Sequence, residues 1–553
     1  MTFNFKKHKD SLFFVPLGGS NEIGMNLNAY HLDGKWLLID MGIGFTDDYF
    51  PGVDIMVPDI DFLAENKDDI LGLVITHAHE DHLGAVPYLW DEIQCPIYAT
   101  KFTASVLRHK LQSNNNFGKI PVNLVEEGGE LQIGPFSLDL VPLTHSIPEM
   151  QAIAINTSHG TIMHTGDWKL DATPMVGPAS DEIALKEYGD KGVLAMVCDS
   201  TNVFVEGESG SESDVRNALV EQVKAQKGRV FVATFASNIA RVESILHAAK
   251  EAGRDVVLAG RSLWRVTSAA KDAGYLLDAP ELISDRDASK LPKDELLILC
   301  TGCQGEPRAA LTRIVNGSHP SLRISKGDTV LFSSRVIPGN ETRLRYITNE
   351  LVKLDVNIIT DKDAFIHVSG HPARDELKRM YELVSPQVAV PVHGEAAHIA
   401  EHARYSKILG VPHSVEPYNG SVIEFKDGRA DIVGHVPTGY FAMDGTSLIP
   451  LNSPVIAMRR RLQESGSLTA SIVLDKDYEL ATKPFITAPG SLDFHDDADL
   501  RDMLSDDIAK ICSKLHGKVK IQTIKEKIIT AIRKRISGEL GKRPMIDVHV
   551  HQI

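Results

Sequence analysis

The segment Thr76-His77-Ala78-His79-Glu80-Asp81-His82-Leu83-Gly84-Ala85 brings three histidines and two acids into six consecutive positions, 77 to 82. It directly follows Ile70-Leu71-Gly72-Leu73-Val74-Ile75, an apolar run that is typical of a buried strand. Imidazole and carboxylate groups together suit a borderline cation such as Zn²⁺ or Mn²⁺. The turn after the strand can direct His77 and His79 toward one ion, and Asp81 and His82 toward a second. A solvated charged loop is the alternative, but such loops favour lysine, serine and glycine over clustered histidine.

The spacing His-x-His-x-Asp-His resembles the signature of the metallo-β-lactamase superfamily, and a dinuclear site needs more ligands than this segment offers. Three candidates stand where expected strands end: His145, Asp167 and His393. Taken singly, each is more often an ordinary loop residue, and their value comes from the first motif, which demands partners of this type. Asp167 can bridge two cations with its two oxygens. We therefore expect one ion to be held by His77, His79, His145 and Asp167, and the other by Asp81, His82, Asp167 and His393.

Asp40 stands in the run Leu37-Leu38-Ile39-Asp40-Met41-Gly42, which matches the first motif of the same superfamily. A ligating histidine usually needs a carboxylate or carbonyl on its other ring nitrogen. We therefore expect Asp40 to orient a ligand rather than to bind the ion itself. The alternative is a turn aspartate, because Asp-x-Gly readily forms turns.

The charge of such a site indicates its substrate. Two divalent ions outweigh the negative charges of Asp81, Asp167 and a bridging hydroxide, so the cluster attracts an anion. Two metals about 3.5–4 Å apart stabilise the attacking and leaving oxygens of a phosphoryl displacement and lower the pKa of the attacking water to about 7. Phosphodiester hydrolysis therefore fits better than amide or thioester hydrolysis, which the ligands alone do not exclude.

Length and composition set wider limits on the chain. Its 553 residues predict about three to four domains. A net charge of −16 argues against a surface coated with basic residues for unspecific nucleic-acid binding, but it allows a local basic groove. No apolar run approaches the roughly 18 residues of a membrane span. Five cysteines make no disulfide framework, and the first apolar run, 12–17, is too short for a signal peptide, so we expect a cytoplasmic protein.

The pattern of elements predicts several domains. Short strands with turns fill residues 1–205, the first part of a metal-hydrolase sandwich, and helices alternate with strands over 206–363, which predicts a parallel sheet covered by helices. The ligand His393 lies beyond this block, so the block must be inserted into the hydrolase domain, which resumes over 364–435. We expect a linker over 436–454 and a small α/β domain over 455–553. A domain-sized second wall suits a long polymer better than a small lactam or thioester.

Several further segments closely resemble the ribonuclease J family, the bacterial β-CASP nucleases. The likeness covers nearly the whole chain, and the final Gly541-Lys542-Arg543-Pro544-Met545 resembles the C-terminal domain of that family. The short tail departs from it, since it leaves little room for partner-binding extensions. The segments that carry the likeness are Leu17-Gly18-Gly19-Ser20-Asn21-Glu22-Ile23-Gly24-Met25-Asn26, Thr234-Phe235-Ala236-Ser237-Asn238, Gly305-Glu306-Pro307, Ser333-Ser334-Arg335-Val336-Ile337-Pro338-Gly339-Asn340-Glu341 and His367-Val368-Ser369-Gly370-His371.

The resemblance implies a metallo-β-lactamase αββα sandwich with an inserted β-CASP domain, two divalent ions and a single-stranded RNA substrate. It implies 5′–3′ exonuclease activity with endonuclease activity, in RNA processing and decay, and a homodimer or homotetramer through the C-terminal domain. Residues 367–371 match the phosphate-binding motif of the family, with His371 as proton donor to the leaving 3′ oxygen. Hydroxyl and amide donors at the end of a strand also suit phosphate oxygens, although an ordinary Pro-Gly turn explains Gly339 equally well and a capped loop is the alternative for either histidine. The expected RNA-binding residues are His367, Ser369, Gly370, His371, Ser333, Ser334 and Asn340.

Other functions would need other features. A DNA-processing β-CASP nuclease would share the metals, and only 2′-hydroxyl and 2′-deoxy substrates would separate the two activities. A scaffold without activity would be expected to lose ligands, and none is missing here. A small-molecule hydrolase of the superfamily would lack the inserted domain.

Overall fold

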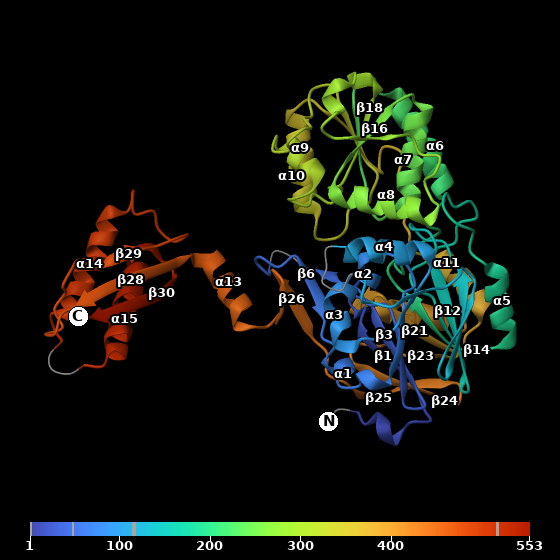
Figure 1. The fold of residues 1–553 in the computed structure, drawn as a ribbon, viewed down its shortest axis with the longest axis horizontal. Helices are drawn as coiled ribbons and strands as arrows, with labels where there is room; N and C mark the ends of the chain where they lie inside the picture. The colour runs from blue at the N-terminus through green and yellow to red at the C-terminus, as the bar shows by residue number, and fades with distance from the viewer. Residues whose placement is uncertain (1–2, 47–48, 113–117, 516–518) are drawn as a thin grey trace. The chain divides into compact units, whose positions relative to one another are not determined.

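The structure is a computed structural model that describes residues 3–46, 49–112, 118–515 and 519–553 (Figure 1). The chain divides into two units, which are described separately. Unit 1 comprises Met1–Gly44 and Val57–Gly439, and unit 2 comprises Phe45–Met56 and Tyr440–Ile553. The chain leaves unit 1 within β5 (Gly44–Phe45) and re-enters it within β6 (Ile55–Pro58).

The first sheet of unit 1 has eight strands in the order β25-β24-β1-β3-β4-β7-β8-β9. Every residue of its central strands β1 and β3 is buried, because one face packs on the second sheet and the other lies beneath helices and loops. The strands of this sheet are β1 (Leu12–Gly18), β3 (Leu27–Leu32), β4 (Lys35–Ile39), β7 (Ile70–Val74), β8 (Ile97–Ala99), β9 (Val122–Leu124), β24 (Ser421–Lys426) and β25 (Arg429–His435).

The second sheet of unit 1 has seven strands in the order β10-β11-β12-β13-β14-β21-β23. Side chains of both sheets, among them Phe14, Leu37, Ile153 and Val197, form one buried core, so the two sheets make a sandwich. These strands are β10 (Glu130–Ile133), β11 (Phe136–Pro142), β12 (Gln151–Thr157), β13 (Gly160–His164), β14 (Val193–Asp199), β21 (Val388–Val392) and β23 (His413–Ser414).

Helices cover the outer faces of this sandwich. Leu377 and Met380 pack with Met196 on the far side of the second sheet, so α11 closes that layer. The fold is therefore an αββα sandwich, as the resemblance implies. Its helices of four or more residues are α1 (Asp61–Ala64), α2 (Glu80–Leu83), α3 (Val86–Ile93), α4 (Lys101–Leu111), α5 (Glu182–Lys191), α11 (Arg374–Val384) and α12 (Ala396–Ile408).

A second α/β body of unit 1 lies between β14 and β21 in the sequence. It has a six-stranded sheet, order β17-β16-β18-β15-β19-β20, in which every pair is parallel, as the alternating pattern predicts. Helices α6 and α7 lie on one side of this sheet, and α9 and α10 on the other (Figure 1). The elements are α6 (Glu212–Ala225), β15 (Val230–Ala233), α7 (Ile239–Glu251), β16 (Asp255–Ala259), α8 (Arg261–Ala273), β17 (Leu282–Ser284), β18 (Leu296–Cys300), α9 (Ala310–Val315), β19 (Thr329–Phe332), α10 (Glu341–Lys353) and β20 (Asn357–Ile359).

The chain then returns to the sandwich. Strand β21 pairs in parallel with β14, with Val388 opposite Ala195 and Val392 opposite Asp199. The α/β body is thus an insertion into the hydrolase fold, as the position of His393 requires. A short parallel pair, β2 (Ser20–Asn21) with β22 (Gly394–Glu395), fixes the segment that directly follows His393.

Unit 2 holds a three-stranded sheet, order β29-β28-β30, under two long helices. Strand β28 alternates buried and half-buried residues, and α15 buries an isoleucine at every fourth position from Ile524 to Ile536. Within 436–454, where the sequence predicts a linker, the chain forms an antiparallel hairpin of β26 (Tyr440–Asp444) and β27 (Ser447–Pro450). The other elements are α13 (Pro454–Ser465), β28 (Ser467–Leu474), β29 (Phe485–Thr487), α14 (Ala498–Cys512), α15 (Ile521–Leu540) and β30 (Met545–Gln552).

The structure also bears on membrane spans and on the cysteines. In the described part of the chain, no helix has the length and apolarity needed to cross a bilayer. All five cysteines are free and buried, including Cys300 and Cys303 of the lone Cys-x-x-Cys segment.

Candidate metal centre

The histidine-rich segment forms the loop after β7 and the short helix α2, at the edge where both sheets of the sandwich end. Strand β7 ends at Val74 and the short helix α2 begins at Glu80, so 75–79 cross the end of the sandwich. The ring of His79 lies between two others, with its Nδ1 atom 3.1 Å from His77 Nε2 and 3.1 Å from His145 Nε2. One ligand atom from each of these histidines and one from Asp167 lie within 4.8 Å of one another. The four predicted residues of the first ion therefore form one group.

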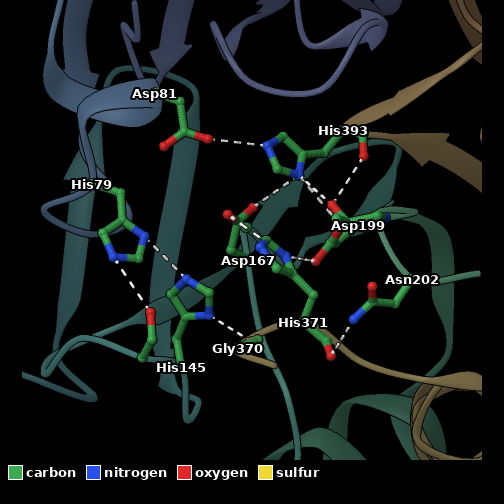
Figure 2. A network of polar contacts seen from close by, with 12 residues as sticks. His79, Asp81, His145, Asp167, Asp199, Asn202, Gly370, His371 and His393 are labelled. Atoms are coloured by element: carbon green, nitrogen blue, oxygen red, sulfur yellow. Dashed lines mark hydrogen bonds and ion pairs between the residues drawn. The ribbon is translucent and has the colours of Figure 1, made fainter. Parts of the chain in front are cut away.

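The second predicted group consists of Asp81, His82, Asp167 and His393, two of which come from helix α2. His82 Nε2 lies 3.2 Å from Asp167 Oδ2, and His393 Nε2 lies 3.2 Å from Asp81 Oδ2. These four residues also offer ligand atoms within 4.8 Å of one another. Asp167 belongs to both groups, which is the arrangement that a bridging carboxylate requires (Figure 2).

The donor atoms of the first group fit a cation. Burial lowers the pKa of His79 to about 4 and holds the pKa values of His77 and His145 well below their ordinary range, so the rings are neutral. Neutral imidazole nitrogens that face one another at 3.1 Å cannot all donate to each other. The Zn–N distance of about 2.0–2.1 Å in a tetrahedral site places neighbouring nitrogens roughly 3.3 Å apart. A shared cation therefore explains why the nitrogens converge.

Hydrogen bonds from the other ring nitrogen orient the histidines that are predicted as ligands. His82 Nδ1 donates to Asp40 Oδ2 at 2.7 Å, the role that the sequence predicts for this aspartate. Asp40 also accepts from the backbone N–H of Thr76 at 2.8 Å, which ties it to the start of the histidine loop. His145 Nδ1 donates to the carbonyl oxygen of Gly370 at 2.6 Å. A Cβ atom at residue 370 would lie 2.7 Å from the His145 ring, so glycine permits this close approach.

Asp199, which the sequence did not single out, is a central residue of the site. It ends β14 beside the strand that Asp167 follows, and its side chain is fully buried. His371 Nδ1 donates to Asp199 Oδ2 at 2.8 Å, and His393 Nδ1 lies 3.4 Å from Asp199 Oδ1 (Figure 2). Together with Asp167 these residues form a third group of converging ligand atoms. The strand-end rule that selected Asp167 would have found Asp199 as well.

The carboxylates control the charge of the neighbouring histidines. Burial favours the neutral ring of His371, but Asp199 and then Asp167 outweigh it and raise the pKa of His371 above its ordinary value. Burial also opposes the charged ring of His393, yet Asp167, Asp199 and Asp81 hold its pKa well above the ordinary range. His371 can therefore carry a proton near neutral pH, whereas the rings of the first group cannot.

Ser333 and Ser334 both lie buried in the structure. The side chain of Ser333 is completely buried, its hydroxyl donates to the carbonyl oxygen of Ile366 at 2.7 Å, and it accepts from Arg241 Nη1 at 2.8 Å. Its hydroxyl therefore joins two loops. Ser334 is also buried, and its hydroxyl lies 3.4 Å from the carbonyl oxygen of Cys303. The sequence could not show this because the partners come from distant segments.

The other predicted phosphate-binding groups are partly open. The hydroxyl oxygen of Ser369 accepts from Asn202 Nδ2 at 2.8 Å and from the backbone N–H of His371 at 3.1 Å, so its own proton can donate to a ligand. Asn340 Nδ2 donates to Gln304 Oε1 at 3.3 Å. The ring of His367 lies against the buried guanidinium of Arg241, with Nδ1 3.2 Å from Nη1. Burial, followed by the charge of Arg241, holds the pKa of His367 well below its ordinary range.

Four family models match separate stretches of the chain. The family model described as "Ribonuclease J, beta-CASP domain" matches residues 227–351, and that of the "Ribonuclease J C-terminal domain" matches 454–553. The model of the "Metallo-beta-lactamase superfamily" matches 27–180. The model described as "Zn-dependent metallo-hydrolase RNA specificity domain" matches 355–417, which includes the loop with His367 and His371 and the predicted ligand His393.

Several curated proteins that are similar to this chain are named ribonuclease J. Ribonuclease J of Sinorhizobium meliloti is 39% identical over 98% of this chain and 98% of its own length. Ribonuclease J of Synechocystis is 37% identical over 87% of this chain and 76% of its own, and that of Thermus thermophilus is 33% identical over 97% and 95%. A solved structure of a protein of unknown function from Enterococcus faecalis aligns with a TM-score of 0.53 at 17% identity, covering 75% of this chain and 100% of that one. At that identity it supports the fold alone.

Proposed function

Because the chain belongs to the ribonuclease J family and is therefore a metal-dependent ribonuclease, we propose that it holds two divalent ions in the paired clusters. The observation that carries this proposal is that Asp167 belongs to both groups of converging ligand atoms. Zn²⁺ is the proposed ion, with Mn²⁺ as the alternative, because the ligands are imidazoles and carboxylates without thiolate. The proposed ligands of one ion are His77, His79, His145 and Asp167, and those of the other are Asp81, His82, Asp167 and His393.

The side chains then divide the work of phosphodiester hydrolysis. When bound, the two ions lower the pKa of a water molecule and stabilise the charge of the reacting oxygens. Asp40 and Gly370 hold the rings of His82 and His145 in place. Asp199 accepts the Nδ1 proton of His371 and keeps the ring protonated, so the ring donates its Nε2 proton to the leaving 3′ oxygen.

RNA phosphates meet the loop 367–371 in this proposal. The hydroxyl of Ser369 and the ring of His367 are the proposed donors to the phosphate oxygens, with Asn340 from the opposite loop, while Ser333 and Ser334 hold these loops together. We propose 5′–3′ exonuclease activity on 5′-monophosphate RNA together with endonuclease activity, in RNA processing and decay. We also propose a cytoplasmic location, with which the five free thiols agree. A further proposal is a homodimer or homotetramer that forms through the C-terminal region 455–553.

Metal analysis combined with activity tests this function. We expect two transition-metal ions per chain under saturating Zn²⁺ or Mn²⁺, and hydrolysis of single-stranded RNA that a chelator abolishes and added metal restores. His79→Ala should lose one ion and most activity, whereas His159→Ala, an exposed histidine in the turn between β12 and β13, should lose neither. Fewer than two ions, or full activity of His79→Ala, would contradict the assignment.

Digestion of RNA with different 5′ ends tests the direction of cleavage. A pocket formed by the loop 367–371 should accept a 5′-monophosphate and reject the bulkier and more highly charged triphosphate. Product mapping should then show mononucleotides released from the monophosphorylated strand. Equal rates on both strands would contradict the proposed pocket.

A further inference from the structure

A crevice of about 1000 Å³ opens in the inserted α/β body, apart from the loops already described. Three residues at its base, Thr234, Gly260 and Thr301, directly follow β15, β16 and β18. It therefore lies at the carboxyl ends of parallel strands. Strands β15 and β18 are neighbours at the centre of the sheet. The connection from β15 runs to β16, toward one edge of the sheet, and the connection from β18 runs to β19, toward the opposite edge. In open parallel sheets such a point of diverging connections is where ligands bind.

The charge of the crevice suits an anion. Four arginines line it, Arg261, Arg265, Arg308 and Arg313, against two acids, Asp285 and Glu306. This local excess of positive charge stands in a chain whose net charge is −16. The exposed guanidinium of Arg261 has no hydrogen bond or ion pair with any residue that the structure describes. A guanidinium matches the oxygens of a phosphate in a two-point hydrogen bond.

An exposed aromatic ring gives the crevice a second kind of contact. Trp264 lines the crevice and is 41% exposed, whereas Trp36, Trp90 and Trp168 are buried, at 8% or less. Nucleic-acid bases stack on such rings with little regard to sequence, because every base has a flat π face. Arginine and tryptophan on the first turn of one helix, α8, thus offer contacts for a phosphate and for a base.

The crevice also lies near the hydrolase domain. Helix α8 packs against α4 of the sandwich. Lys110 of α4 pairs with Glu80 of the histidine-rich segment, and His109 of the same helix pairs with Asp272 of α8 at 2.7 Å, so α4 connects the metal loop to α8. A strand that occupies the metal site can therefore continue toward this part of α8.

We propose that the crevice binds the RNA substrate away from the scissile bond, with a base stacked on Trp264 and phosphates paired with Arg261 and Arg265. This inference rests on the proposed ribonuclease function and adds a subsite to it. A phosphorylated nucleotide could reach the crevice either as part of an RNA strand or free in solution, and the packing of α8 against α4, a helix of the domain that holds the proposed metal ligands, favours the strand.

Tryptophan fluorescence tests binding directly. We expect a decamer of oligouridylate, mixed with the metal-loaded enzyme in a stopped-flow instrument and observed before turnover, to quench the emission. Trp264→Phe should remove the quenching, because the other three tryptophans are buried. Absence of quenching in the wild-type enzyme would overturn the proposal. If uridine 5′-monophosphate quenched at the same concentrations as the decamer, the crevice would be a free-nucleotide site and the RNA assignment would be wrong.

Steady-state kinetics separate this subsite from the chemistry. The double variant Arg261→Gln/Arg265→Gln should raise KM for the decamer by about tenfold or more while kcat and the KM for a dinucleotide stay unchanged. Lys271→Gln is the matched control, since Lys271 is an exposed cation in the last turn of the same helix. An unchanged KM of the double variant, or an equal rise in Lys271→Gln, would overturn the subsite but leave the ribonuclease standing. A wild-type enzyme that hydrolysed neither substrate would instead refute the proposed function, and the fluorescence experiment would still decide on the crevice.

Discussion

At the scale of single residues, the site depends on carboxylates that set the protonation of neighbouring rings. Asp199 keeps a proton on His371, and Asp40 holds the Nδ1 proton of His82, so its Nε2 atom faces Asp167. Histidines that lack such a partner, such as His79, are neutral because they are buried. The same residue type thus supplies the proposed metal ligands and the proposed proton donor within one small volume, and the neighbouring carboxylate decides which role each ring can take.

Two variants distinguish the proton donor from a phosphate-binding residue. His371→Ala should lower kcat by about 10²–10⁴-fold with nearly unchanged RNA affinity, because proton donation matters mainly in the transition state. His367→Ala should weaken RNA binding more than turnover. Measured kcat and RNA affinity of both variants decide the roles, with the exposed His159→Ala as control. An unchanged kcat in His371→Ala would remove this residue from the mechanism.

At the scale of elements, one buried ion pair of the inserted body contacts the two loops that begin near Ser333 and Ile366. Arg241 of α7 is fully buried, and its guanidinium donates to Glu212 Oε1 of α6 at 2.7 Å. It also donates to the carbonyl oxygens of Ser333 at 3.0 Å and Ile366 at 3.1 Å. Two helices and two loops therefore meet at one side chain, which we infer positions the segment that carries His367.

Removal of this arginine should affect stability and RNA binding separately. Arg241→Met leaves Glu212 buried without a counter-charge, which should cost about 3–5 kcal/mol of unfolding free energy. The double variant Arg241→Met/Glu212→Gln should recover part of that loss but not the RNA affinity, because the loop carbonyls still lack their donor. Denaturant midpoints and KM values measure the two effects, and Lys250→Met, an exposed cation of the same helix, should change neither. If the double variant restored KM, the positioning role would be wrong.

At the scale of the whole molecule, stability depends on several buried neutral histidines. His31 packs among Phe5, Phe13 and Trp36, and burial lowers its pKa to about 4 against the opposite effect of Asp69. Burial likewise lowers the pKa of His402 to about 4. The unfolded chain takes up these protons near pH 6.5, whereas the folded chain takes them up only near pH 4. The stabilising effect is therefore complete above pH 6.5 and declines as the pH falls from 6.5 toward 4.

The stability of His31→Phe should depend less on pH than that of the wild type. Between pH 7 and pH 5 the wild-type chain should lose about 2 kcal/mol of unfolding free energy through this ring alone, a loss that the variant lacks. Denaturant unfolding at the two pH values, followed on unit 1, measures the difference. Replacement of the exposed His159 should leave the wild-type dependence intact, and an identical dependence in His31→Phe would contradict the assignment.

The sequence alone determined the hydrolase class and the candidate ligands. The histidine-rich segment is local, with its donors one to five residues apart, and strand ends can be recognised from short apolar runs. The alternation of helices and strands likewise predicted the parallel sheet of the insertion, because its period is a local property. A resemblance over nearly the whole chain added the family, which the comparisons confirm.

Only the tertiary structure decided which distant groups meet. Asp199 and His371 lie 172 residues apart, and Arg241 reaches Ser333 across 92 residues, distances over which no local pattern carries information. The burial of Ser333 and the hairpin within 436–454 have the same origin, since each depends on a partner segment elsewhere in the chain. Local spacing selects residue types for metal chemistry, whereas long-range packing decides which of them are oriented, which are buried and which remain free to bind RNA.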